Sequence, residues 1–316
     1  MYKISITAKS TLLFWLLVFS GCKSLQANSD VTGQQEGELS FQGIDRNYII
    51  YTPQIYSATK AAPLIVVLHG GHGDAKKSFK RTGFDSIADK EGFIAIYPEA
   101  VGNNWNDGRK ATASEVDDVA YINALIDHVS SQRNIDSKRV YVTGLSNGGM
   151  MTQRLACESP QRFAAFASVI ANIPVSLQAV CKPKQAVALM MINGSADPLM
   201  PPAGGEIKKG RWIGTGGTVI STQQTAQFWS DTNQCKGSRS VSKLPDKDPA
   251  DGTRIEKTEY TGCRQGGEVV LYTVEGGGHT WPGSKSKPFF RISGKTSYDM
   301  KASEVIWEFF NQHLSK

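Results

Sequence analysis

Unbroken apolar runs that alternate with helical segments constrain the fold of this chain more than any other feature of its sequence. Residues 64–68 read LIVVL, and a second run follows in GFIAIYPEA at 92–100, after a helical segment near 84–91. A run without polar alternation suits a strand that is covered on both faces, as the strands of parallel sheets are. The sequence therefore predicts an α/β protein with a mostly parallel central sheet and helices on both faces.

The rest of the chain continues this alternation. We expect further strands at residues 46–52, 139–144 and 186–194, and near 255–260 and 268–274. A helix is predicted over 114–133, capped by Ser114, with an apolar stripe made of Val119, Ile122, Leu125, Ile126 and Val129. A last helix is expected to turn inward Val305, Ile306, Phe309 and Phe310. One domain over 37–316 is predicted, with an excursion at about 199–263 that interrupts the pattern.

The segment VYVTGLSNGGMMTQ, residues 140–153, holds a serine on a turn between a predicted strand and a predicted helix. Its G-x-S-x-G pattern is typical of a nucleophile elbow, in which a sharp turn exposes a serine hydroxyl. Gly144 and Gly148 lack side chains that would collide where the backbone folds back. The pattern also occurs in plain turns, but the strand-turn-helix context favours Ser146 as a nucleophile.

A serine hydroxyl becomes strongly nucleophilic when an imidazole accepts its proton. In proteins with this elbow the histidine follows both the nucleophile and the acid along the chain, which leaves His279 and His313. His313 lies on the last predicted helix, where a packed or solvated histidine is ordinary. His279 lies in the glycine-rich segment EGGGHTWPG directly after a predicted strand, so it is the predicted base.

The carboxylate that orients the histidine should lie between these two residues and follow a strand. Asp197, in NGSADPLMP, meets both conditions, and Pro198 stiffens its loop. The other acidic candidates follow no apolar strand or precede Ser146; they are Asp117, Asp118, Asp231, Asp246, Asp248 and Asp251. We therefore predict Asp197 as the orienting carboxylate.

Acyl transfer also needs donors for a developing oxyanion. The backbone N–H of Asn147, the residue after the predicted nucleophile, is one candidate. The second should come from the loop LHGGHGD at 68–74, with Gly71 or His72 as the donor. His69 is expected to support this loop rather than react.

The first residues read MYKISITAKSTLLFWLLVFSGC, a short basic region followed by an apolar run and small residues. The apolar run is too short to cross a bilayer, so residues 1–21 are predicted to be a signal peptide and the chain to be exported. FSGC resembles a lipobox, which predicts lipidation of Cys22, the one anchor to a membrane that we expect. An ordinary signal peptide cut nearby is the alternative. Residues 22–36 are polar and are predicted to act as a tether.

The four remaining cysteines are Cys157, Cys181, Cys235 and Cys263. An even number in an exported chain implies disulfides, and three pairings are possible. We favour the sequential pairs Cys157–Cys181 and Cys235–Cys263, because they close short loops. A metal site is the weaker alternative, since no two cysteines have C-x-x-C spacing.

The formal net charge is +6, of which Lys3 and Lys9 belong to the predicted signal peptide. This charge is too mild to argue for a nucleic-acid partner. The densest basic cluster, KKSFKR at 76–81, is interpreted as a solvated face.

Six ordered blocks between residues 46 and 283 resemble the secreted α/β-hydrolase esterase family of polyhydroxybutyrate-depolymerase-type and feruloyl-esterase-type enzymes. The blocks are LHGGHGD, GFIAIYPEA…NNWND, VDDVAYINALI, IDSKRVYVTGLSNGGMM, NGSADPLMP and GGGHTWPG. The resemblance implies the triad Ser146, Asp197 and His279, supports the two sequential disulfides, and implies no organic cofactor or metal. The chain departs from the family at Asn193, where the family often has a histidine, and over residues 202–217.

The resemblance implies a serine esterase whose partner is an ester substrate. The candidate substrates are feruloyl or acetyl esters of plant polysaccharide and, alternatively, short-chain polyhydroxyalkanoates. Trp105 and Trp281 are predicted to line the substrate as aromatic walls, although tryptophans are often simply packed. A peptidase on the same fold and an inactive, polysaccharide-binding lipoprotein are the remaining alternatives.

Overall fold

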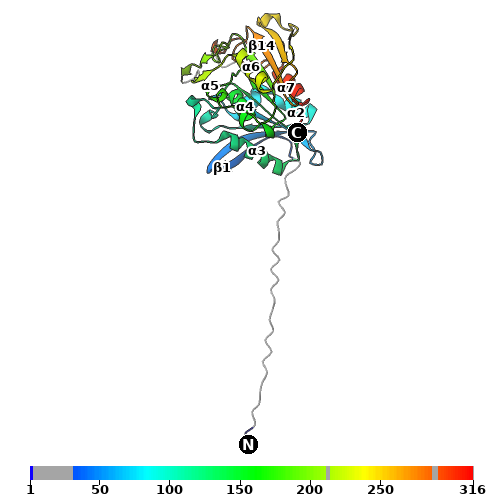
Figure 1. The fold of residues 1–316 in the computed structure, drawn as a ribbon. Coiled ribbons are helices and arrows are strands. Elements are labelled where there is room, and N and C mark those ends of the chain that lie inside the picture. Colours follow the sequence, from blue (N-terminus) through cyan, green and yellow to red (C-terminus); the bar gives the residue numbers. More distant parts are fainter. Residues whose placement is uncertain (3–30, 211–213, 287–290, 316) are drawn as a thin grey trace.

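The computed structural model of the chain describes residues 1–2, 31–210, 214–286 and 291–315. Ten strands of these ranges form one sheet (Figure 1). In spatial order they are β1 (Gly33–Phe41), β2 (Ile44–Thr52), β4 (Ile94–Pro98), β3 (Ala62–Leu68), β5 (Ile135–Leu145), β6 (Ala165–Val169), β7 (Ala188–Gly194), β14 (Glu268–Glu275), β13 (Arg254–Tyr260) and β12 (Arg239–Lys243). The strands from β4 to β14 run parallel to one another, and antiparallel strands flank them on both sides. The predicted mostly parallel α/β sheet is confirmed.

Helices cover both faces of the sheet, as the unbroken apolar strands predict. One face packs against α3 (Asp118–Gln132), α4 (Asn147–Glu158) and α6 (Thr222–Thr232), and the other against α1 (Ala75–Thr82), α2 (Phe84–Glu91) and α7 (Ala302–Phe310). Strand β3 shows why its sequence has no polar alternation. Leu64 and Val66 belong to the first core and Ile65 and Val67 to the second, and all four are completely buried.

Short elements complete the chain. Helix α5 spans Val175–Gln178, and 3-10 turns cover Val101–Asn103, Lys110–Thr112, Pro160–Arg162, Pro249–Asp251 and Arg291–Ser293. No helix within the described ranges is long and apolar enough to span a membrane.

The helix predicted over 114–133 begins later than expected. Asp117, not Ser114, caps α3, because its side chain accepts the N–H of Ala120 at 3.0 Å. The Asn106 side chain donates to the carbonyl of Ser114 at 3.1 Å and thereby ties the preceding residues to the 100–110 loop. The helix therefore starts only where the backbone is released from this loop.

The predicted excursion is shorter than the sequence indicates. Helix α6 packs on the sheet, and β12 and β13 extend it, so these parts of 199–263 belong to the main fold. What leaves the sheet is a small hairpin of four two-residue strands among the described residues. They are β8 (Gly205–Glu206), β9 (Lys209–Gly210), β10 (Gly214–Thr215) and β11 (Thr218–Val219), paired as β11 with β8 and β10 with β9.

The structure describes only part of the N-terminal segment, namely residues 1–2 and the residues from 31 onward. Residues 33–36, predicted as the end of the tether, are part of β1, because they pair with β2 from Gly33 onward. The predicted signal peptide from residue 3 onward and the predicted lipidation site Cys22 lie outside the described residues.

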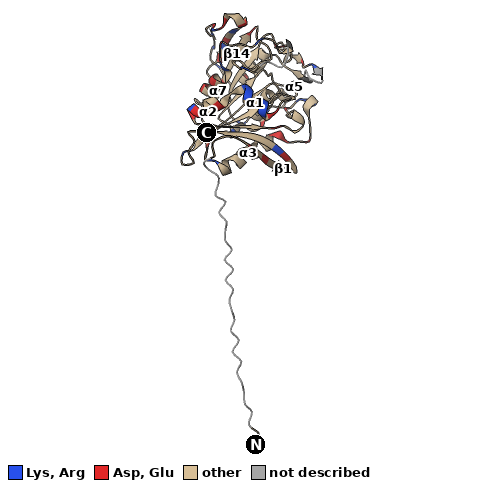
Figure 2. Cartoon of the chain, turned by 180° about the vertical axis from the view of Figure 1, so that it is seen from behind, with Lys and Arg blue, Asp and Glu red and all other residues tan. Residues whose placement is uncertain are grey.

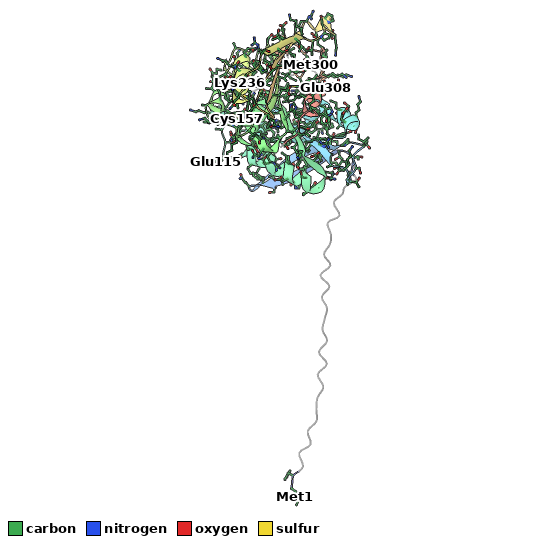
Figure 3. The ribbon with its side chains drawn as sticks, turned by 45° about the vertical axis from the view of Figure 1, so that its right-hand side comes forward. Met1, Glu115, Cys157, Lys236, Met300 and Glu308 are labelled. Atoms are coloured by element: carbon green, nitrogen blue, oxygen red, sulfur yellow. A yellow bond between two sulfur atoms is a disulfide. The ribbon has the colours of Figure 1, made fainter. Side chains whose placement is uncertain are left out.

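Both predicted disulfides are present. Cys157 at the end of α4 is bonded to Cys181, and Cys235 after α6 is bonded to Cys263 after β13 (Figure 3, where Cys157 is labelled). The bonds join segments 24 and 28 residues apart in sequence. The alternative of a cysteine metal site is thereby excluded.

Candidate active site

The sheet topology brings the three predicted triad residues to one edge. Ser146 follows β5, Asp197 follows β7 and His279 follows β14, and these strands are parallel and close in the spatial order of the sheet. In a parallel sheet the carboxyl ends of all strands point the same way, so the loops after them gather beyond one edge. Residues separated by more than a hundred positions can therefore share a single cavity.

Ser146 occupies a strained turn. Its backbone lies at φ 56° and ψ −119°, a conformation that side-chain-bearing residues rarely adopt, and its N–H donates to the Val169 carbonyl at 2.9 Å. A Cβ on Gly148 would lie 2.4 Å from the Leu68 carbonyl oxygen, and one on Gly144 would lie 2.4 Å from the Gly148 carbonyl oxygen. Both glycines are therefore required for the close approach, as the sequence predicts, and the turn directs the serine into the cavity.

His279 and Asp197 form a direct pair. The Nδ1 of His279 lies 2.7 Å from Asp197 Oδ2, and the side chains are 13 % and 2 % exposed, respectively. The other carboxylate oxygen, Oδ1, accepts the backbone N–H groups of Leu199 and Met200, each at 2.8 Å. Because the carboxylate is held on both oxygens, it fixes the imidazole with Nδ1 protonated. The Nε2 atom is then the nitrogen that can accept a proton.

Ser146 and His279 line the same cavity, which has a volume of about 270 Å³. Its apolar wall is formed by Met150 of α4 together with Met200 and Ile207 from the segment before and within the small hairpin. The sequence did not single out these three side chains, because the hairpin has no periodic pattern and its position over the site depends on the fold. The segment over which the sequence departs from the family thus supplies Ile207 to this cavity.

The proposed oxyanion donors require one correction. The His72 N–H donates to the Asn103 carbonyl at 2.9 Å, so it is already engaged and does not serve as the second donor. The N–H of Gly71, which also lines the cavity, has no acceptor among the described residues. The N–H of Asn147 opens α4, where the helix dipole favours negative charge. Gly71 and Asn147 remain the candidate pair.

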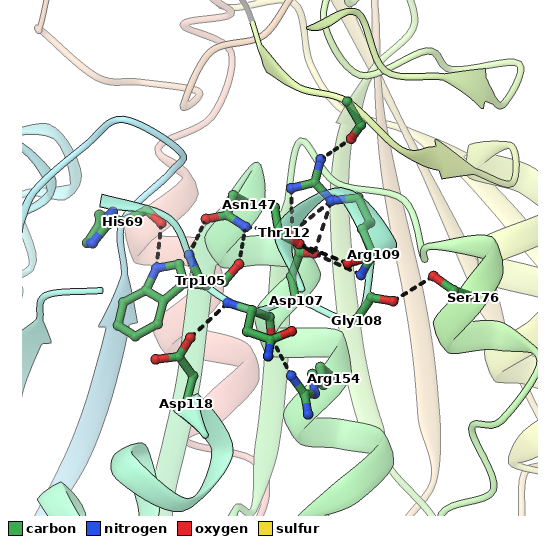
Figure 4. Close-up of polar contacts among 12 residues, drawn as sticks. His69, Trp105, Asp107, Gly108, Arg109, Thr112, Asp118, Asn147, Arg154 and Ser176 are labelled. Carbon is green, nitrogen blue, oxygen red and sulfur yellow. Dashed lines mark hydrogen bonds and ion pairs between the residues drawn. The ribbon is translucent and has the colours of Figure 1, made fainter. Parts of the chain in front are cut away.

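A buried polar network holds the side chain of Asn147 in place (Figure 4). Its side-chain oxygen accepts the N–H of Trp105 at 2.7 Å, and its amide nitrogen donates to the Trp105 carbonyl at 3.0 Å and to Asp107 Oδ2 at 2.5 Å. Asp107 is in turn paired with Arg109, whose Nη2 lies 2.6 Å from Oδ2. Arg109 Nη1 donates to the Gly216 carbonyl at 2.5 Å and so anchors the hairpin segment to the same network. No sequence pattern indicates this network, because it joins residues that lie far apart along the chain.

The two tryptophans predicted to line the substrate are buried instead. Trp105 is completely buried, and its Nε1 donates to the His69 carbonyl at 2.9 Å. Trp281 is 2 % exposed, packs against Phe84, and donates to the Ser303 hydroxyl at 3.1 Å. Neither ring lines the cavity. Both indole N–H groups are satisfied inside the protein, so these side chains shape the loops rather than the cavity wall.

His69 supports the glycine loop, as the sequence predicts. Its Nε2 accepts the N–H of Ala100 at 3.0 Å, and its Nδ1 donates to the Gly70 carbonyl at 2.8 Å. Burial lowers the pKa of His69 to about 4, so the ring is neutral at physiological pH. The loop that carries Gly71 is therefore braced by an uncharged imidazole.

The two remaining positions in question have structural roles. Asn193 is buried, accepts the Ala171 N–H at 3.1 Å and donates to the Asn172 side chain at 2.8 Å. His313 pairs with Glu268 at 3.0 Å near the C-terminus of α7. Neither residue lines the cavity that contains Ser146 and His279.

Together these groups provide what acyl transfer needs. A serine held on a strained turn, an imidazole and two candidate backbone donors border one cavity. The orienting carboxylate does not line the cavity, but it contacts Nδ1 of this imidazole, which leaves Nε2 without a hydrogen bond among the described residues. Such an arrangement can deprotonate the serine as it attacks a carbonyl carbon and can stabilise the oxyanion that results.

Known proteins are similar to this chain in sequence or in fold. Residues 46–199 match the family described as Esterase PHB depolymerase. The protein NocK of Nocardia uniformis subsp. tsuyamanensis, whose name describes it as an esterase, is 30% identical over 280 residues, which are 86% of this chain and 81% of NocK. Feruloyl esterase B of Piromyces equi is 26% identical over 74% of this chain and 42% of its own length. The structure of an acetyl xylan esterase from Aspergillus awamori matches 88% of this chain and 99% of its own with a TM-score of 0.61 at 15% identity.

Proposed function

Because the chain belongs to the Esterase PHB depolymerase family, and so to the serine esterases, we propose that it cleaves esters by forming an acyl-enzyme on Ser146. Feruloyl or acetyl esters of plant polysaccharide, or related esters, are the proposed substrates. The observation that supports this best is the 2.7 Å pair of His279 and Asp197 at the cavity that Ser146 lines.

The reaction has two proton-coupled halves. Ser146 Oγ attacks the ester carbonyl carbon while His279 Nε2 takes the hydroxyl proton, and the same proton then passes to the leaving alcohol. In the second half, water attacks the acyl carbonyl carbon while His279 Nε2 takes its proton. The bond to Ser146 Oγ then breaks, the proton passes from His279 to Ser146 Oγ, and the carboxylic acid leaves. Asp197 keeps the Nδ1 proton in place and stabilises the imidazolium that forms in each half.

The oxyanion would be stabilised by the N–H groups of Asn147 and Gly71. Removing one such donor commonly slows acyl transfer by about 10²–10³-fold. His279 acts as the general base in this step.

The catalytic proposal is tested with Ser146→Ala. We expect this variant to lose hydrolysis of 4-nitrophenyl acetate and butyrate and to lose labelling by a fluorophosphonate reagent, with an unchanged circular dichroism spectrum. Ser137→Ala, an exposed serine at the opposite end of β5, is the matched control and should keep full activity. Turnover by Ser146→Ala at the wild-type rate would refute the assignment of the nucleophile.

The natural acyl group is decided by direct comparison. Relatives named as feruloyl esterase and acetylxylan esterase motivate methyl ferulate and acetylated xylan as the first substrates to assay. The family description motivates the alternative, a short-chain polyhydroxyalkanoate depolymerase, which is assayed by clearing of a polyhydroxybutyrate suspension. Clearing without release of ferulate or acetate would favour this alternative.

A different class of function is a polysaccharide-binding lipoprotein on an inactive hydrolase scaffold. Such a protein would not react with fluorophosphonate at Ser146, and this reaction distinguishes it from an enzyme. Disulfides are typical of exported proteins, and export to the cell surface or periplasm agrees with the two that the chain contains. Anchoring through a lipid on Cys22 is tested by labelling with a palmitate analogue. Label that persists in Cys22→Ala would end this part of the proposal.

A further inference from the structure

Helix α1 presents part of its basic sequence to the catalytic cavity. The cluster KKSFKR at 76–81, interpreted from sequence as a solvated face, divides between two sides of the helix. Lys77 and Arg81, four residues apart, line the cavity together with Ser78, whereas Lys76 and Lys80 do not. Of these four basic side chains, only Arg81 is partly buried, and the three lysines are exposed. Figure 2 shows the blue of lysine and arginine along α1.

Two of the three Lys or Arg side chains at the cavity have carboxylate partners. Lys77 Nζ lies 2.8 Å from Asp74 Oδ2, and the same aspartate caps α1. Arg109 is paired with Asp107. Within the described ranges, the guanidinium of Arg81 has no ion pair with a carboxylate.

The surroundings of Arg81 disfavour a charged guanidinium that has no counter-ion. The side chain is partly buried, and burial lowers the pKa of its guanidinium, against the opposite influence of Asp74. A cation in the last turn of a helix also complements the helix dipole, but that effect does not require the side chain to line a cavity. Lys80, in the same turn, serves the dipole while remaining in solvent.

We propose that Arg81 binds a carboxylate on the substrate, so that this esterase prefers esters whose acid or alcohol part carries a second, ionised carboxyl group. The inference rests on the proposed esterase function and specifies its substrate class. A guanidinium matches a carboxylate with two parallel, charge-assisted hydrogen bonds, which gives orientation as well as affinity. The charge of Asp74 opposes an anion here, but its pairing with Lys77 offsets this effect.

The test compares pairs of esters that differ in one charge. On the acid side, the pair is 4-nitrophenyl hydrogen glutarate and 4-nitrophenyl valerate. On the alcohol side, it is 4-acetoxybenzoate and 4-acetoxybenzamide. For each pair, kcat/KM of the anionic ester is divided by that of the neutral ester, in the wild type and in Arg81→Met. Intrinsic reactivity cancels when the two enzymes are compared.

We expect Arg81→Met to lower this ratio by about tenfold or more for at least one pair, because a charge-assisted hydrogen bond is lost. The pair that responds identifies the side of the scissile bond on which the carboxylate lies. Arg81→Lys should retain part of the preference, and Lys80→Met, the matched control on the same helix, should leave the ratio unchanged. A ratio within twofold of wild type for both pairs in Arg81→Met would overturn the proposal.

A measurement on the wild type covers the case in which Arg81→Met does not fold. Glutarate should inhibit hydrolysis of 4-nitrophenyl acetate more strongly than glutaramide, and added salt should weaken this difference. Equal inhibition by the two compounds would overturn the carboxylate site while leaving the esterase function intact. Failure to hydrolyse 4-nitrophenyl acetate at all would instead refute the proposed function.

Discussion

Replacing Asp107 by asparagine should destabilise the fold more than any comparable change at the surface. Asp107 is completely buried and accepts hydrogen bonds from five donors on three residues. They are Arg109 N at 3.2 Å, Arg109 Nε at 3.0 Å, Arg109 Nη2 at 2.6 Å, Thr112 Oγ1 at 2.6 Å and Asn147 Nδ2 at 2.5 Å. Asparagine offers one acceptor oxygen, and its NH₂ group would face further donors.

The main loss of stability comes from the charge of Arg109, which stays buried after its partner is removed. Arg109 is 2 % exposed, so without Asp107 its guanidinium becomes a buried cation with no carboxylate partner. Breaking a buried ion pair in this way costs about 3–5 kcal/mol, equivalent to a fall in Tm of roughly 10 °C for a domain of this size. The N–H of Asn147 also loses part of its support, so kcat should fall as well.

Urea unfolding of four proteins measures this effect. They are the wild type, Asp107→Asn, Arg109→Met and the double variant, in which the charges are removed together. The double variant should be more stable than the sum of the single losses predicts, because each single variant leaves a bare charge. Asp127→Asn is the matched control, since Asp127 pairs with Arg162 but is 68% exposed, and should cost less than about 1 kcal/mol. A loss below about 1 kcal/mol in Asp107→Asn, or additive losses in the cycle, would refute the reasoning.

Three further predictions follow from the site and the core. Gly148→Ala would place a Cβ 2.4 Å from the Leu68 carbonyl oxygen, so it should lower stability by at least about 1–3 kcal/mol and abolish activity; wild-type Tm and turnover would contradict this reading of the turn. Burial lowers the pKa of His69 from 6.5 to about 4. The unfolded chain therefore binds a proton more readily than the folded protein does, and the free energy of unfolding should fall by about 3 kcal/mol as the pH falls from 6.5 to 4. Unfolding free energies of wild type and His69→Gln between pH 4.5 and 7.5 test this, and equal slopes would count against it. Replacing both Cys157 and Cys181 by alanine should lower the free energy of unfolding by about 3 kcal/mol, because the bond no longer restricts the unfolded chain. Thermal unfolding without reductant measures this effect, and an unchanged Tm would contradict it.

The sequence by itself determined the kind of sheet, the order of the elements and the candidate triad. Strands such as β3 carry apolar side chains on successive positions, and this pattern permits only a strand that is covered on both faces. The turn at Ser146 is recognisable because its glycines answer a local steric need, and Asp197 and His279 each follow a strand directly. These features depend on residues that are neighbours along the chain, so a one-dimensional pattern records them.

The tertiary structure decided everything that depends on contacts between distant segments. It engages the His72 N–H with Asn103, buries both predicted tryptophans, and pairs Asp107 with Arg109 behind Asn147. It also turns one side of α1 into the cavity and leaves Arg81 there without a carboxylate among the described residues. No periodicity encodes these outcomes, because whether a polar group is satisfied, exposed or left facing a cavity is set by what packs against it.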